Sequence, residues 1–138
     1  MTRLLLVFTL IGMMAQTGCT IYQPPSPDSG KTAKIDVEDP HRFPLRLAIV
    51  EIDGAKSSSL SAYGLWRPPP TLLVTEGRHH FVVRFSAGTA HGAIKLWLDA
   101  MAGHDYTLKS ASEGYRFTAW FVENGTDKPV GGIAGTEK

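Results

Sequence analysis

The sequence predicts an all-β fold, a small antiparallel β-sandwich of about seven strands that follows a signal peptide and a flexible linker. From residue 35 onward, short apolar runs are separated by turns rich in glycine and proline about every ten residues. Several of these runs alternate apolar and polar side chains, which is the period of a strand that buries one face. No stretch sustains the 3.6-residue period of an amphipathic helix over three turns.

The first expected strand covers residues 43–54 and is rich in β-branched side chains. It ends in Asp53-Gly54, a dipeptide that strongly favours a tight hairpin turn. Residues 71–77 form a second short apolar run that ends in a glycine, and residues 78–88 form a third. The third run alternates, so we expect one face to hold Phe81, Val83 and Phe85, and the other His80, Val82, Arg84 and Ser86.

Three longer strands are expected in the C-terminal half, over residues 92–103, 104–112 and 114–125. A short last strand begins at Pro129-Val130, where an edge position tolerates a residue without an amide proton. The inward side chains of the three longer strands are expected to be Ile94, Leu96 and Leu98; Tyr106 and Leu108; and Tyr115, Phe117, Ala119 and Phe121.

The N-terminal region has the features of an export signal. Arg3 precedes an almost wholly apolar run, Leu4 to Ala15, which is shorter than the ~20 residues of a membrane-spanning helix. A run of this length matches the apolar part of a secretory signal. It is followed by Thr17, Gly18 and Cys19, the only cysteine of the chain. Two alternatives remain for this thiol, an incidental residue beside an ordinary cleavage site or a disulfide with a second chain.

The Thr-Gly-Cys order resembles the lipobox of bacterial lipoproteins. The resemblance implies cleavage before Cys19 and acylation of its thiol, which would anchor the chain in a lipid bilayer. Several acyl chains make such an anchor stable. Thr20 stands where an inner-membrane retention signal usually places aspartate, so we expect the bacterial outer membrane, facing the periplasm.

The chain therefore divides into three expected parts: a lipoprotein signal peptide at residues 1–18, the lipidated cysteine with a flexible Pro/Ser-rich linker at 19–34, and a β-sandwich domain at 35–138. The linker contains Pro24, Pro25 and Pro27, which favour an extended chain of ~3.1 Å per residue. A linker of this kind would hold the domain up to roughly 40–50 Å from the lipid surface.

Four short motifs follow one another along the chain: IDG at residues 52–54, VTEGRHHFVV at 74–83, AGHDYTL at 102–108 and AWFVENG at 119–125. Each contains a glycine at a turn where a strand begins or ends. Their order resembles that of small bacterial lipoproteins with PEGA-like, transthyretin-type β-sandwich domains, over about residues 45–130. The resemblance implies a non-catalytic domain, commonly of unknown role in the cell envelope.

Charge and motifs argue against several function classes. The chain has 14 basic and 13 acidic residues, whereas a nucleic-acid-binding domain normally shows a basic patch, so we expect no nucleic-acid partner. No Gly-x-Ser-x-Gly motif occurs, and we do not expect an enzyme; a hydrolase or metal protein is the least favoured alternative. The histidines do not have zinc-site spacing, so we expect no metal or cofactor and interpret them as turn and strand-surface residues: His41, His79, His80, His91 and His104.

The candidate binding residues are aromatic. Trp97 and Trp120 each lie opposite the apolar face of their strand, the second beside Arg116, and would form one exposed platform if the two strands share a sheet. The connection at residues 56–71 is long for a sandwich and contains Tyr63 and Trp66, which either cap the core or contact a partner. We expect a protein-interaction module; the alternative is a module that binds glycan or peptidoglycan through exposed tryptophans.

Overall fold

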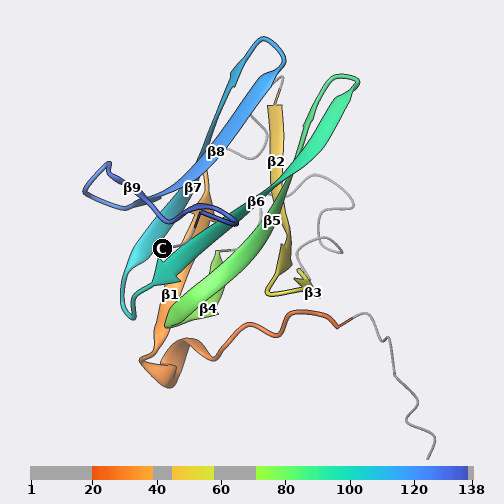
Figure 1. The fold of residues 1–138 in the computed structure, drawn as a ribbon. Helices are drawn as coiled ribbons and strands as arrows, with labels where there is room; N and C mark the ends of the chain where they lie inside the picture. Colours follow the sequence, from red (N-terminus) through yellow and green to blue (C-terminus); the bar gives the residue numbers. More distant parts are fainter. Residues whose placement is uncertain (1–19, 39–44, 58–70, 137–138) are drawn as a thin grey trace, which may run out of the picture.

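The computed structural model describes residues 20–38, 45–57 and 71–136. It confirms the all-β class: the described residues form two five-stranded sheets that pack face to face (Figure 1). There are ten strands in the described residues rather than about seven. The expected count was wrong because two of the three additional strands, at Ala55–Lys56 and Gly132–Ile133, have only two residues, too few to produce an alternating pattern, and the third, at Thr32–Val37, lies partly in the expected linker.

Sheet A has the strand order β10-β6-β5-β2-β3. Its strands are β2 (Leu45–Ile52), β3 (Ala55–Lys56), β5 (Gly77–Ala87), β6 (Ala90–Ala100) and β10 (Gly132–Ile133). The expected hairpin at residues 53–54 is confirmed, because Asp53 and Gly54 join β2 to β3 with φ angles of 50° and 80°. Positive φ at both central residues is the geometry of a type I′ turn.

Sheet B has the order β4-β1-β7-β8-β9. Its strands are β1 (Thr32–Val37), β4 (Leu72–Thr75), β7 (Asp105–Glu113), β8 (Arg116–Glu123) and β9 (Pro129–Val130). Every pair in the two sheets is antiparallel except β1 and β7, which run parallel with Ile35 opposite Tyr106. The expected antiparallel sandwich is thus present, with one parallel pair that was not expected. The exception arises because β1 continues into β2 of the other sheet and is not joined to β7 by a hairpin.

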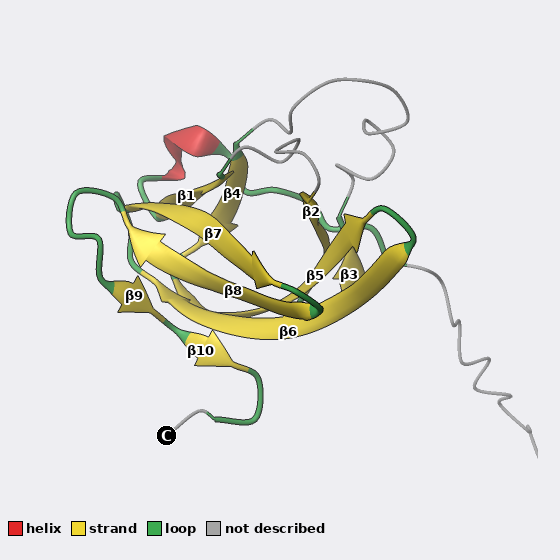
Figure 2. Ribbon diagram, turned by 90° about the horizontal axis from the view of Figure 1, so that it is seen from above, coloured by secondary structure: helices red, strands yellow, loops and turns green. Residues whose placement is uncertain are grey.

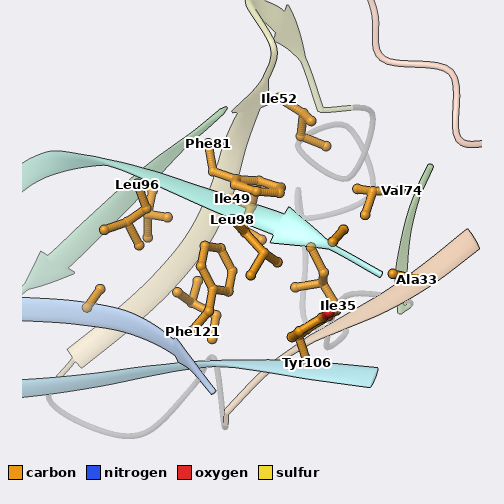
Figure 3. Close-up of a cluster of buried hydrophobic side chains, with 14 of the residues drawn as sticks. Ala33, Ile35, Ile49, Ile52, Val74, Phe81, Leu96, Leu98, Tyr106 and Phe121 are labelled. Atoms are coloured by element: carbon orange, nitrogen blue, oxygen red, sulfur yellow. The ribbon is translucent and has the colours of Figure 1, made fainter. Parts of the chain in front are cut away.

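The core lies between the sheets and follows the expected alternation closely (Figure 3). Phe81 of sheet A and Phe121 of sheet B are each 1% exposed, and their ring centroids lie 5.0 Å apart. Phe85 and Phe117 stack at 3.9 Å toward one end of the core, where both are only partly buried. Gly92 accommodates this stack, because a Cβ at that position would lie 2.4 Å from the Phe85 ring.

Tyr115 is the one wrong assignment among the expected inward residues. Its relative exposure is 105%, because Gly114 and Tyr115 form the turn between β7 and β8. Gly114 has a φ of 58°, and the first cross-strand pair is Glu113 with Arg116. The alternating pattern extends to Tyr115, one residue before β8 begins at Arg116. Alternation alone does not show where a strand begins.

The flexible linker expected at residues 19–34 is also wrong for its described part. Ala33 lies within β1 and is fully buried, so the domain begins before residue 35. Upstream of it, a short 3-10 turn at Pro27–Ser29 follows a segment that is docked on sheet A. The Tyr22 amide donates to the Lys56 carbonyl at 2.8 Å, and the Lys56 amide donates to the Thr20 carbonyl at 2.9 Å. Pairing of this kind covers an otherwise open sheet edge.

The two edges of the sandwich are closed in different ways. On one side, the chain passes directly from β9 of sheet B to β10 of sheet A (Figure 2). On the other side, the docked segment Thr20–Tyr22 lies beside β3, and the Tyr22 hydroxyl donates to the Leu73 carbonyl of β4 at 3.0 Å. Tyr22 thereby connects the edge strands of both sheets.

Candidate functional site

Several predicted site residues lie outside the described part of the chain: Cys19, Tyr63 and Trp66, together with His41 and most of the long connection. Within residues 20–38, 45–57 and 71–136, no helix is long and apolar enough to span a membrane. The described site residues are Trp97, Trp120 and Arg116.

Trp97 and Trp120 do not form one platform. Trp97 lies on β6 of sheet A, and Trp120 lies on β8 of sheet B. The neighbours of each tryptophan point into the core, so each indole points to the outer face of its own sheet. The two outer faces are on opposite sides of the sandwich, and the condition for a shared aromatic surface is not met.

Trp97 belongs to a tightly packed cluster on the outer face of sheet A. The Arg78 guanidinium carbon lies 4.7 Å from the centre of the indole, within the range of a cation–π contact. The same guanidinium binds Asp99 through two hydrogen bonds of 2.6 and 2.7 Å. Hydrogen bonding from Arg78 is the main reason that the pKa of Asp99 is lowered.

The C-terminal segment also packs closely against Trp97. A Cβ at Gly131 would lie 2.0 Å from the Trp97 carbonyl oxygen, and one at Gly132 would lie 2.9 Å from the indole Nε1. The buried Nε1 has no hydrogen-bond partner among the described residues. Trp97 is therefore half-buried between Arg78 and β10, and it presents only part of its ring to solvent.

Trp120 is also half-buried, on the outer face of sheet B. Its direct cross-strand neighbour is Lys109, whose ammonium lies 3.6 Å from a carboxylate oxygen of Asp127. Thr118 and Arg116 follow on the same face of β8, and both are exposed. The structure thus places Arg116 and Trp120 on one surface, as expected, and Trp97 on another.

The charges of the described residues are segregated, although their totals are nearly equal. The outer face of sheet A carries five basic residues against two acidic ones: Arg46, Lys56, Arg78, Arg84 and Lys95, with Glu51 and Asp99. We call this surface the sheet A face; all five basic side chains are exposed. The other described residues include five basic and nine acidic ones.

Sequence reasoning missed this face because it considered only the total charge. The signal was present in the alternation: Arg78, Arg84 and Lys95 occupy outward positions of the expected strands at residues 78–88 and 92–103. The missing information was that these two strands are hydrogen-bonded neighbours, with Val82 directly opposite Lys95.

His79 differs from the expected surface histidine, because it is only 7% exposed. Its Nδ1 lies 2.6 Å from a carboxylate oxygen of Asp53, and its Nε2 lies 2.8 Å from the Thr75 carbonyl. The second oxygen of Asp53 accepts from the His80 amide at 2.8 Å. Because a carbonyl oxygen only accepts, the Nε2 of His79 is a donor here. The His79 side chain thereby joins β4 of sheet B to β5 of sheet A.

His104 makes an analogous contact at the same end of the sandwich. Its Nδ1 is paired with Glu123, which links the β6–β7 turn to the end of β8. The described residues contain no group of three histidine, cysteine, aspartate or glutamate side chains arranged to hold a metal ion. Tyr106, beside His104, has a raised pKa, caused chiefly by burial.

A scan against models of protein families, a search of curated proteins and a search of solved structures each found no match. The resemblance to PEGA-like lipoproteins consequently stays a prediction from the four sequence motifs.

Proposed function

We propose that this chain is a membrane-anchored, non-enzymatic lipoprotein of the bacterial cell envelope, whose β-sandwich contacts another protein. The observation that carries the proposal is the position of Thr20. This residue is held on β3 by the Lys56 amide, and it directly follows Cys19. A chain cleaved before Cys19 would keep its folded domain whole and would carry the acyl groups at the first residue of the domain.

Metabolic labelling tests the anchor. Cells that express the full chain are fed radiolabelled palmitate, and the protein is recovered from the membrane fraction. We expect the label to enter the wild-type chain and to be absent from Cys19→Ser. An unlabelled wild-type chain that washes from membranes as easily as the variant would refute the anchor. The proposed location is the outer membrane, facing the periplasm, because Thr20 stands in place of the usual retention aspartate.

The proposed protein contact is the outer face of sheet B around Trp120 and Arg116. Large aromatic side chains and arginine supply much of the binding energy in protein interfaces. Trp120 is half-buried there, with an exposed threonine and Arg116 on the same strand face. The glycan alternative is not carried forward, because its two tryptophans lie on different sheets.

Site-directed crosslinking tests this contact in intact envelopes. A photoreactive residue replaces Thr118, next to Trp120 on the outer face, and a matched one replaces Ala93 on the sheet A face; both native residues are exposed. We expect a specific protein adduct from position 118 that weakens in Trp120→Ala. Adducts at background level from position 118, or equal adducts from both positions, would contradict the proposal.

A further inference from the structure

We propose that the sheet A face is a docking surface for an anionic lipid bilayer, so that the domain lies flat on the membrane that anchors it. This inference rests on the proposed anchor at Cys19. It goes beyond that anchor, because it states which face of the sandwich contacts lipid headgroups and by what chemistry.

The first argument is the place where the anchor joins the domain. Thr20 and Tyr22 exchange two backbone hydrogen bonds with Lys56 of β3, and Ile21 forms a parallel bridge with the same residue (Figure 1). Successive Cα atoms lie 3.80 Å apart, so the acylated residue is attached within ~4 Å of Thr20. The proposed anchor is thus one peptide step from Thr20, which lies at the β3 edge of sheet A.

The second argument is electrostatic. Each lysine or arginine near an anionic lipid surface increases the equilibrium constant for docking about fivefold. The sheet A face has five such residues and two acidic ones, whereas the other described residues have more acidic than basic groups. Among the described residues, those of the sheet A face therefore gain most from approaching anionic lipid, and this face adjoins Thr20.

The third argument is that both carboxylates on the sheet A face lie beside basic partners. Asp99 is bound through both oxygens by Arg78, and Glu51 lies directly opposite Lys56 across the β2–β3 pair. In contrast, Arg46 lies opposite Ser86, and Arg84 lies between Ala48 and Ala93. These small neighbours leave the sides of both arginines open to the phosphates of lipid headgroups.

Trp97 completes a composition that is common at lipid interfaces. Tryptophan and tyrosine are enriched where protein meets the headgroup layer, and basic side chains gather beside them. Trp97 lies on the sheet A face with Arg78 stacked over it and His80 directly opposite across the β5–β6 pair. In Figure 2 the sheet A face is the side of β5 and β6 that is turned away from β7 and β8.

The test uses the full acylated protein reconstituted into vesicles of phosphatidylcholine with or without phosphatidylglycerol. Cys19 is the only native cysteine, and its thiol is acylated in the proposed form, so a fluorophore is placed through Ala93→Cys on the sheet A face or through the matched Ala111→Cys on the outer face of sheet B. Both alanines are exposed and lie in long strands. A headgroup-attached nitroxide lipid then quenches whichever fluorophore lies close to the bilayer.

We expect much stronger quenching at position 93 than at position 111 in vesicles that contain phosphatidylglycerol, and a smaller difference in phosphatidylcholine alone or at high salt. The combined variant R46E, R84E and K95E should lower the docking equilibrium by at least a hundredfold, as three fivefold factors imply. A matched variant on sheet B, K34E, K109E and R116E, should leave the difference unchanged.

The outcomes separate the two proposals. A chain that does not sediment with vesicles refutes the anchor. A chain that sediments but shows equal quenching at positions 93 and 111, or stronger quenching at 111, overturns the docking surface alone. A difference that persists unchanged in the charge-reversed sheet A variant also overturns it.

Discussion

Removal of the Tyr22 side chain is the most direct test of the docked N-terminal segment. Tyr22 is partly buried against the core cluster, and its hydroxyl donates to the Leu73 carbonyl on the opposite sheet. Deletion of a fully buried aromatic side chain costs ~3–5 kcal/mol, so a half-buried ring accounts for about 2 kcal/mol. The hydrogen bond adds about 1 kcal/mol. Tyr22→Ala should therefore destabilise the domain by about 3 kcal/mol, and Tyr22→Phe by about 1 kcal/mol.

The chain provides a matched control for this prediction in Tyr115. Its side chain is fully exposed at a turn, so Tyr115→Ala should change stability by less than about 0.5 kcal/mol. A domain of this size loses roughly 4 °C of melting temperature for each kcal/mol, so calorimetry should show a fall of about 12 °C for Tyr22→Ala. Equal melting temperatures for Tyr22→Ala and Tyr115→Ala would refute the docked arrangement.

Hydrogen exchange provides a second readout for Tyr22→Ala. The Lys56 amide donates to the Thr20 carbonyl, whereas the adjacent Ser57 amide donates to the Val50 carbonyl within sheet A. If the segment detaches, exchange at Lys56 should accelerate while exchange at Ser57 changes much less. Uniform acceleration at both amides would mean that the segment opens only with the whole domain.

Three further predictions concern pH, a glycine and the core. Burial, and secondarily the charge of Asp53, raises the pKa of Tyr22 above 10.0. The neutral Tyr22 hydroxyl therefore stabilises the fold fully below pH 10.0, and this stabilisation is lost as the pH rises through the folded-state pKa. The free energy of unfolding should consequently fall less steeply with alkaline pH in Tyr22→Phe than in the wild type. Gly131→Ala should lower the free energy of unfolding in urea by about 2–4 kcal/mol, because the added Cβ would clash with the Trp97 backbone. Gly88 also has a positive φ but has open space around it, so Gly88→Ala should lower this free energy by only about 1 kcal/mol. Phe121→Ala should cost ~3–5 kcal/mol and the less buried Phe117→Ala clearly less, and equal losses in thermal melts would contradict the assigned burial.

The sequence predicted the parts of the fold that depend on local alternation. The inward sets of β5, β6 and β7 were all correct, because a strand with one buried face must alternate its side chains. The hairpin at residues 53–54 was also predictable, since few residues other than glycine, asparagine and aspartate adopt positive φ readily. These features depend only on residues that are close together in the chain.

The incorrect predictions concern features that depend on distant partners. The segment at residues 20–31 is rich in proline and polar residues, and composition alone indicates a flexible chain. Its first three residues are instead docked through contacts of Thr20 and Tyr22 with Lys56 and Leu73, which lie far along the sequence. The shared tryptophan platform failed for the same reason, because the alternation shows which side of a strand a residue occupies but not which sheet the strand joins.

Near-zero net charge likewise does not determine how charges are distributed over a folded surface. No block of like charge appears in the sequence, because Arg46 lies on β2, Arg84 on β5 and Lys95 on β6. The β2-β5-β6 order brings them onto one face, and the nine acidic residues of the other described surfaces balance the total. Two proteins with the same composition but a different strand order would have different electrostatic potentials at the surface that faces a membrane. In this chain, the edge strand β3 that binds the N-terminal segment belongs to the same sheet as the basic face. The position of the proposed anchor and the surface charge would consequently favour one orientation on a lipid bilayer, which neither feature would determine alone.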